Sequence, residues 1–153
     1  MRTRVRHPAG MRRRLALAVV ALAAAAPAAA QAADLVGSPG PDRLVGGRGA
    51  DRIAGRGGDD VLYGRGGKDA LFGDAGRDRL FGGPGDDTLL GGAGDDRLNG
   101  GLGADIMIAG AGNDVIRARD GARDQISCGP GRDRVIADAD DQVGGDCEVV
   151  DRG

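Results

Sequence analysis

Residues 82–90 read GGPGDDTLL and residues 91–99 read GGAGDDRLN, which are two consecutive copies of one nine-residue unit. The same period continues in both directions through nine in-register units that span residues 37–117. The fourth residue of every unit is glycine, the sixth is aspartate, and the eighth is aliphatic or methionine. Such a fixed period indicates a solenoid, in which each repeat stacks on its neighbours.

The composition alone allows another interpretation. Glycine supplies 31 of the 153 residues, and the aromatic residues are one Tyr and two Phe, which is also typical of a flexible Gly/Asp linker. A flexible linker does not require three positions to stay in register over nine units, so we prefer an ordered repeat. A chain this poor in aromatic residues does not build an ordinary globular core with an enclosed pocket.

The acidic residues point to a metal ion. Glu148 is the only glutamate among 23 acids, and a short carboxylate suits a site that a tight turn builds around an ion. Calcium takes about six to eight oxygen ligands, from carboxylates and backbone carbonyls. After a one-residue slip near Ala118, two irregular units continue the repeat and add two more aspartates to the set. The predicted aspartate ligands are Asp42, Asp51, Asp60, Asp69, Asp78, Asp87, Asp96, Asp105, Asp114, Asp124 and Asp133.

The glycines have a matching role. We expect glycine at the first, second and fourth positions to reach the positive φ values that turn several carbonyls toward one point. The glycines predicted to contribute to the metal sites are Gly83, Gly85, Gly92, Gly94, Gly101, Gly103, Gly110 and Gly112.

These units resemble the RTX (hemolysin-type) calcium-binding repeat, GGxGxDxUx, from Gly37 to about Ile136. The resemblance implies an all-β fold, a right-handed parallel β-roll (a β-helix solenoid) in which two units form one coil. It also implies two parallel sheets with calcium between successive turns, so that units i and i+2 share an ion. Nine in-register units then make pairs from Asp42 with Asp60 to Asp96 with Asp114, which gives up to about seven Ca²⁺.

The chain departs from this pattern at the second position of four early units. We therefore expect the better sites farther along the chain, at Asp87, Asp96, Asp105 and Asp114. The departing residues are Ser38, Arg56, Arg65 and Asp74.

The last three residues of each unit are expected to form a short strand. Its seventh and ninth side chains point outward and its eighth points inward, so the core receives one aliphatic side chain per unit. Stacked strands lie about 4.8 Å apart, which brings metal-free carboxylates into mutual repulsion. Because so thin a core does not offset the ordering of the backbone, we expect folding and calcium binding to be one event.

The N-terminal segment predicts export. Residues 1–14 are basic, residues 15–26 are apolar, and Ala30-Gln31-Ala32 is a small-residue cleavage site, so residues 1–32 are read as a signal peptide. Met11 is an alternative start. The alternative interpretation is a membrane anchor, which needs about 20 apolar residues. We expect no membrane span after the signal is removed. The mature protein is predicted to be secreted and extracellular.

The domain plan continues with a calcium-binding β-roll over residues 33–136 and a C-terminal cap over residues 137–153, where the repeat fades. Cys128 and Cys147 are the only cysteines. In an exported chain they are expected to form a disulfide that ties the cap to the last full coil, and two free thiols are the alternative.

The residue inventory argues against catalysis. Beyond the predicted signal the chain has no histidine and only two serines, Ser38 and Ser127, so we expect no enzyme. The segment after residue 14 holds 15 bases and 23 acids, a formal charge of −8, which disfavours nucleic acid as a partner. The expected function is a secreted, non-catalytic calcium-binding β-roll that serves as a structural or interaction module. The alternative is an adhesion or surface-docking solenoid that acts beside a larger secreted partner.

One outward stripe is a candidate contact surface. Alternate units belong to opposite sheets, so one sheet presents Phe72, Leu90 and Ile108 on neighbouring strands. We expect self-association or a protein partner at this apolar stripe.

Overall fold

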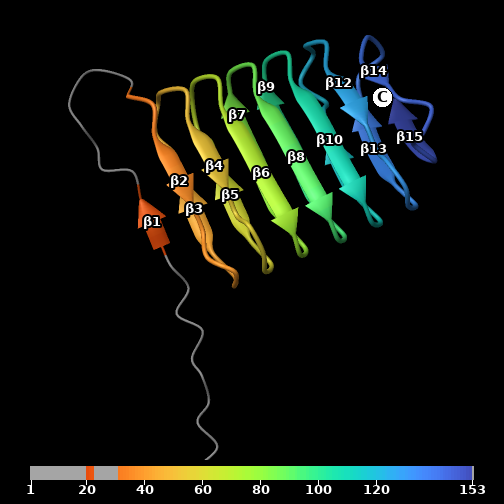
Figure 1. Cartoon of the computed structure of the whole chain (residues 1–153). Helices are drawn as coiled ribbons and strands as arrows, with labels where there is room; N and C mark the ends of the chain where they lie inside the picture. The colour runs from red at the N-terminus through yellow and green to blue at the C-terminus, as the bar shows by residue number, and fades with distance from the viewer. Residues whose placement is uncertain (1–19, 23–30, 153) are drawn as a thin grey trace, which may run out of the picture.

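The computed structural model describes residues 20–22 and 31–152, which form a parallel β-solenoid of about seven turns with no helix in those residues. Two parallel sheets lie face to face, and the chain passes from one to the other after every strand (Figure 1). The predicted all-β solenoid is confirmed. The expected signal peptide lies largely outside the described residues; within it, residues 20–22 form strand β1, which pairs with β3.

The strands divide by parity between the two sheets. The odd-numbered sheet contains, in order, β1 (Val20–Leu22), β3 (Arg43–Val45), β5 (Val61–Tyr63), β7 (Arg79–Pro84), β9 (Arg97–Leu102), β11 (Val115–Arg117), β13 (Arg134–Ala137) and β15 (Val149–Arg152). The even-numbered sheet contains β2 (Asp34–Val36), β4 (Arg52–Ala54), β6 (Ala70–Ala75), β8 (Thr88–Ala93), β10 (Ile106–Ala111), β12 (Gln125–Ser127) and β14 (Gln142–Val143).

The register matches the nine-residue period. Within a sheet, Leu62 pairs with Leu80, 18 residues later, so alternate units do occupy opposite sheets. Past the slip the spacing becomes 19, and Met107 pairs with Ile126. The loop after β11 therefore absorbs the extra residue without breaking the stack.

The core is one row of side chains from each sheet. The eighth residue of each unit is almost fully buried between the sheets, with an exposed fraction of at most 1% over the nine regular units. These residues are Leu44, Ile53, Leu62, Leu71, Leu80, Leu89, Leu98, Met107 and Ile116. Their flanking seventh and ninth side chains face outward in most strands, as the alternation predicts.

Five central strands are longer than the expected three residues. Strands β6 to β10 each have six residues, because they continue into the first three residues of the next unit. There the turns also pair in register, as Asp74 with Gly92 and Gly83 with Gly101. Stacking of identical turns thus adds backbone pairing that the side-chain pattern does not reveal.

The C-terminal segment continues the solenoid. Strand β14 pairs with β12 and β15 pairs with β13, so part of residues 137–153 forms one more irregular coil. The predicted disulfide is present, with the Cα atoms of Cys128 and Cys147 5.3 Å apart. Residues 20–22 and 31–152 contain no helix of sufficient length and apolar character to span a membrane.

Candidate metal centre

The sixth-position aspartates stand at the two edges of the solenoid, each directly before a strand. All eleven predicted aspartates are buried, with exposed fractions of 4% or less. Carboxylates are seldom buried to this extent unless they are paired or bound to a metal ion. The environment of each carboxylate oxygen therefore decides what these turns do.

From Asp51 to Asp133, one oxygen of each of these carboxylates belongs to a ladder that runs along the solenoid. The backbone N–H of Asp78 donates to Oδ1 of Asp96, one coil later, at 2.8 Å. The same bond recurs from coil to coil along both edges, from Asp42 with Asp60 to Asp114 with Asp133, at 2.7–2.8 Å. The sixth-position residue is thus fixed by its neighbour one coil before.

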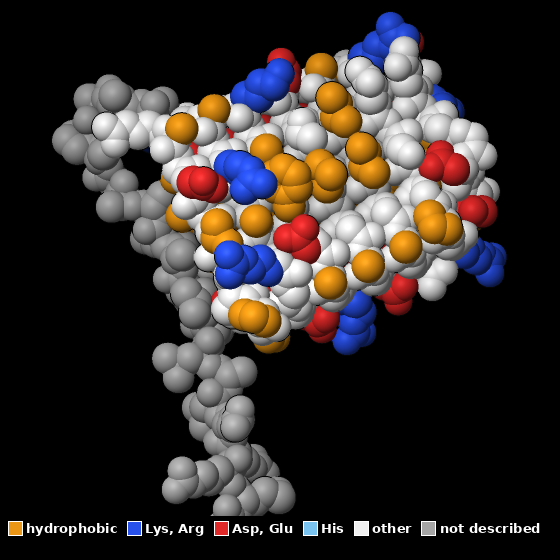
Figure 2. Space-filling view, viewed as in Figure 1, with side chains coloured by type: hydrophobic (Ala, Val, Ile, Leu, Met, Phe, Trp, Pro, Cys, Tyr) orange, Lys and Arg blue, Asp and Glu red, His pale blue; other side chains and the backbone are white. Residues whose placement is uncertain are grey.

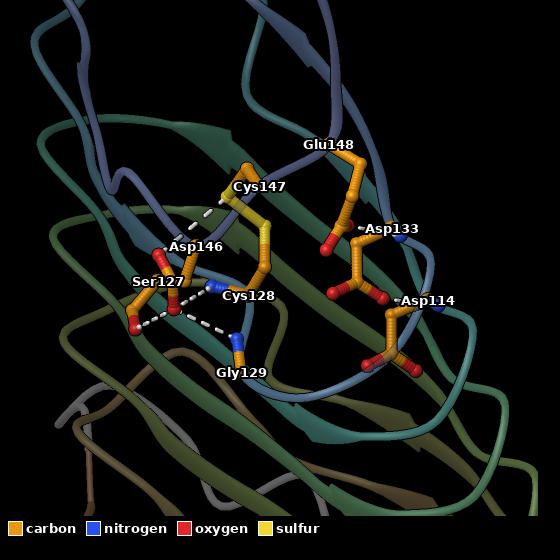
Figure 3. The surroundings of a disulfide bond; sticks show 8 residues. All are labelled: Asp114, Ser127, Cys128, Gly129, Asp133, Asp146, Cys147 and Glu148. Atoms are coloured by element: carbon orange, nitrogen blue, oxygen red, sulfur yellow. Dashed lines mark hydrogen bonds between the residues drawn. A yellow bond between two sulfur atoms is a disulfide. The ribbon is translucent and has the colours of Figure 1, made fainter.

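Two further acids join this ladder in the C-terminal segment. The N–H of Asp124 donates to Asp141 Oδ1 at 2.9 Å, and the N–H of Asp133 donates to Glu148 Oε2 at 2.8 Å. Figure 3 shows Asp114, Asp133 and Glu148 following one another along one edge. Sequence analysis missed both acids because they lie 17 and 15 residues after their partners, outside the period.

The second carboxylate oxygen is different in most turns. Among the described residues, eight Oδ2 atoms are buried and have no hydrogen-bond partner. An unsatisfied buried oxygen costs about 1–3 kcal/mol, and more when it is charged. These atoms belong to Asp60, Asp69, Asp78, Asp87, Asp96, Asp105, Asp114 and Asp133.

A backbone carbonyl lies close to these oxygens. The space where Gly73 would carry a Cβ is 2.5 Å from Asp78 Oδ2 and 2.5 Å from the carbonyl oxygen of Gly91, in the next coil. The same pairing of a sixth-position Oδ2 with a first-position carbonyl recurs at Gly37, Gly46, Gly55, Gly64, Gly82 and Gly91. Each such turn brings a carboxylate oxygen and a carbonyl oxygen to the same space, an arrangement that a bound cation would stabilise.

This geometry corrects one expectation about the glycines. Positive φ occurs at second and fourth positions, as at Gly92 (115°) and Gly94 (128°), but not at the first-position glycines. At Gly37, Gly46, Gly55, Gly64, Gly73, Gly82 and Gly91, a Cβ would enter the space between the carboxylate and the next carbonyl. At these turns the missing side chain, not the dihedral angle, explains the glycine, whereas the ninth unit begins with Ala109.

The first two turns are built differently from the others. Here the second residue donates its backbone N–H to the carboxylate of its own turn, from Ser38 to Asp42 Oδ2 and from Gly47 to Asp51 Oδ2. Neither second residue has positive φ. In the turn that precedes β6, the N–H of Arg65 instead donates to the Gly82 carbonyl at 2.8 Å. The Oδ2 atom of Asp69, in the same turn, therefore lacks that donor.

The three non-glycine second-position residues of the later turns adopt the glycine conformation. Arg56, Arg65 and Asp74 have φ of 80°, 84° and 74°. A left-handed conformation costs a non-glycine residue about 1–2 kcal/mol. The stacking of the turns therefore imposes this backbone even where the residue type opposes it.

Burial makes these carboxyl groups hard to ionise. Desolvation raises the pKa of Asp96 and Asp105 to about 7, and raises that of Asp60, Asp69, Asp114 and Asp124 to about 6. The ladder N–H lowers each of these values, and neighbouring carboxylates raise them further. A bound cation would oppose desolvation and stabilise the ionised form.

The donor set is all oxygen. No three His, Cys, Asp or Glu side chains converge to form a metal cluster within residues 20–22 and 31–152, so side chains alone do not complete a site. Carboxylates supplemented by backbone carbonyls are the hard ligands that calcium prefers. The buried, partnerless Oδ2 atoms and the carbonyls beside them therefore fit Ca²⁺.

The C-terminal coil closes one edge with a side chain that sequence analysis did not identify. Asp146 Oδ2 accepts hydrogen bonds from the N–H groups of Cys128 and Gly129 and from the Ser127 hydroxyl (Figure 3). The Gly129 N–H is the main cause that lowers the pKa of Asp146. This carboxylate lies beside the disulfide. It accepts hydrogen bonds from N–H groups that a further coil would otherwise have to pair.

Comparison with known proteins gives one match. The family model for the RTX calcium-binding nonapeptide repeat (4 copies) matches residues 36–71, 72–107 and 99–135. A search of curated proteins found no match.

Proposed function

Because the chain belongs to the RTX calcium-binding nonapeptide repeat family, whose repeats bind calcium, we propose that it is a secreted, non-catalytic structural or interaction module that folds when calcium binds. The observation that carries the proposal is the row of eight buried Oδ2 atoms without a hydrogen-bond donor. So many buried anionic oxygens are incompatible with a stable fold unless a cation neutralises them.

The proposed ligands are the sixth-position aspartates, which would supply Oδ2, and the turn glycines, which would supply carbonyl oxygens. The strongest sites are proposed at Asp87, Asp96, Asp105 and Asp114, where the second-position residue is glycine and bears positive φ without strain. The proposed number of ions is up to about seven, one for each pair of in-register units. When bound, the ion supplies charge neutralisation and no reaction chemistry.

Two features support export. The segment over residues 1–32 has the composition of a signal peptide, and the Cys128–Cys147 disulfide suits an oxidising compartment. Calcium outside cells reaches the range in which weak sites of this kind fill. The chain would therefore be calcium-free and unfolded before export, and it would bind calcium and fold after export.

Calcium titration tests the proposed function. The mature chain in chelator is expected to lack most β structure, as measured by circular dichroism, and to gain it with a midpoint of about 0.1–1 mM Ca²⁺. Magnesium should substitute poorly, because it demands a small octahedral site. The same folded spectrum in chelator and in calcium would refute the coupling of folding to the ion.

The contrast between the two kinds of turn gives a second prediction. Asp96→Ala should raise the calcium midpoint by about three- to tenfold, whereas Asp51→Ala should raise it by less than about twofold. Asp96 has a partnerless Oδ2, while Asp51 Oδ2 already accepts the Gly47 N–H. The two midpoints are measured by calcium titration with circular dichroism, and equal shifts would show that the two turns bind calcium alike.

We further propose that the apolar stripe of Phe72, Leu90 and Ile108 joins two copies of the chain. These residues lie next to one another in register on β6, β8 and β10, and Ile108 is 41% exposed. Hydrophobic side chains form a band across the face shown in Figure 2. At one end of the stripe the Arg52 guanidinium carbon lies 4.7 Å from the centroid of the Phe72 ring, so a charged side chain borders the apolar surface there.

Replacing Phe72 and Leu90 together with serine tests this surface. The double variant should fold with calcium almost as the wild type does, because both side chains point away from the core. A calcium-dependent dimer of the wild type, measured by sedimentation, should be lost. The matched control is Phe81→Ser on the opposite sheet, which should keep the dimer; a wild type that stays monomeric at high concentration would exclude self-association.

A further inference from the structure

The last turn on the even-numbered edge contains a cation that belongs to the chain itself. Arg152, on β15, donates from Nη1 to the carbonyl oxygens of Asp138, Ala139 and Asp141, at 3.0, 3.3 and 3.3 Å. These three carbonyls come from the turn that precedes β14. One NH₂ group of a positively charged guanidinium therefore lies within hydrogen-bond distance of three oxygens of one turn.

The carboxylates of this turn are also satisfied. Asp141 Oδ1 accepts the ladder N–H of Asp124 at 2.9 Å, and its Oδ2 accepts the N–H of Asp138 at 2.6 Å. Asp138 Oδ2 accepts the N–H groups of Asp120 and Gly121, at 2.9 and 2.7 Å. Asp141 is only 6% exposed, yet neither of its oxygens resembles the partnerless Oδ2 atoms of the preceding turns.

The chemistry of the two kinds of turn is equivalent. Backbone carbonyls that converge on one point need a positive charge there, and a guanidinium supplies both the charge and directed N–H donors. The first turns of the solenoid reach a similar end by another route, since Ser38 and Gly47 donate backbone N–H groups to the carboxylates. Among residues 31–152, the turns at the two ends lack the partnerless Oδ2 atoms found in between.

We propose that the Arg152 guanidinium is the resident cation of the turn over residues 138–141, so that this turn closes without calcium. The calcium-binding turns then end before it, and the ion-dependent coils stack on an end that the chain closes with its own atoms. This inference rests on the proposed function, because it concerns which turns take the ion. By this proposal, Asp141 stabilises the C-terminal cap and does not bind calcium.

The first test compares Arg152 with a neighbouring arginine in saturating calcium. Arg152→Gln removes the charge but keeps N–H donors, and it should lower the Tm by about 5–10 °C. Arg152→Lys should retain most of the stability. The control is Arg119→Gln, which removes an exposed contact to Asp151 and should lower the Tm by less than about 2 °C. If Arg152→Gln resembles either the control or Arg152→Lys, the resident-cation role is wrong.

The second test counts bound ions by native mass spectrometry. Asp141→Asn should bind as many calcium ions as the wild type, whereas Asp96→Asn should bind fewer. Loss of ions from Asp141→Asn would overturn this inference alone, because calcium binding by the other turns would persist. A wild type that binds no calcium would instead refute the proposed function, and the two failures are therefore distinguishable.

Discussion

Replacing Gly94 with alanine is expected to prevent the calcium-dependent fold. Gly94 has φ of 128°, and a Cβ there would overlap the carbonyl group of Gly76, with the carbonyl carbon at 2.7 Å. The obstacle is the backbone of the preceding coil, which cannot move without breaking the stack. We expect a loss of more than about 4 kcal/mol, which is comparable to the whole stability of a small domain. Denaturant unfolding in saturating calcium measures it.

Substitutions at two other glycines distinguish the cost of positive φ from the cost of steric overlap. Gly121 has positive φ (89°) but open space around it, so Gly121→Ala should cost only about 1–2 kcal/mol for the left-handed conformation. Gly145 has open space and no positive φ, so Gly145→Ala should change the stability by less than about 0.5 kcal/mol. A Gly94→Ala protein as stable as the Gly121→Ala protein would mean that the coils are not packed this closely.

Acid should partly replace calcium. In chelator at neutral pH the chain is expected to be unfolded, and lowering the pH from about 7 to about 4 should restore β structure measured by circular dichroism. The folded state raises the pKa of Asp96 and Asp105 from the ordinary 3.8 to about 7, because the buried carboxyl groups are desolvated. Protonation removes the charge that burial disfavours.

The sign of the effect follows from proton binding. Between these pKa values the folded state holds more protons than the unfolded state, so the free energy of unfolding rises as the pH falls and levels off below about 4. Protons should also compete with calcium, so the calcium midpoint should rise on acidification. Asp96→Asn imitates the protonated carboxyl and should make folding in chelator less dependent on pH. Calcium-free β structure that instead increases with pH would contradict the burial of these groups.

The features that repeat strictly were predictable from the sequence. The inward row that includes Leu62 and Leu80, the alternation between sheets, and the Cys128–Cys147 bond all follow from period, parity and cysteine count. The inward row and the alternation depend on residue types that recur in register, and the disulfide depends on there being only two cysteines in the chain. The one-residue slip near Ala118 was also visible, because Asp124 and Ile126 keep their mutual spacing.

The features that depend on a stacked neighbour were not predictable. Gly46 and Gly47 match the motif, yet their turn lacks positive φ and its carboxylate accepts its own N–H, because turn conformation is set by the coil stacked beside it. Asp141 and Glu148 join the ladder through irregular spacing. Asp146 acts through contacts with the preceding coil, and Arg152 acts through contacts with the turn before β14 in its own coil. No local motif encodes either set of contacts.

The alternation of units between sheets restricts how such a chain can change length. Deleting or duplicating a single nonapeptide would transfer every later unit to the opposite sheet, so Leu90 and Ile108 would part from Phe72 and the outer faces would be scrambled. A change by two units preserves both faces, because strands of one sheet recur every 18 residues. Variation in length among proteins built this way should therefore come in whole coils, and the coil, not the nonapeptide, is the unit on which duplication acts without loss of surface.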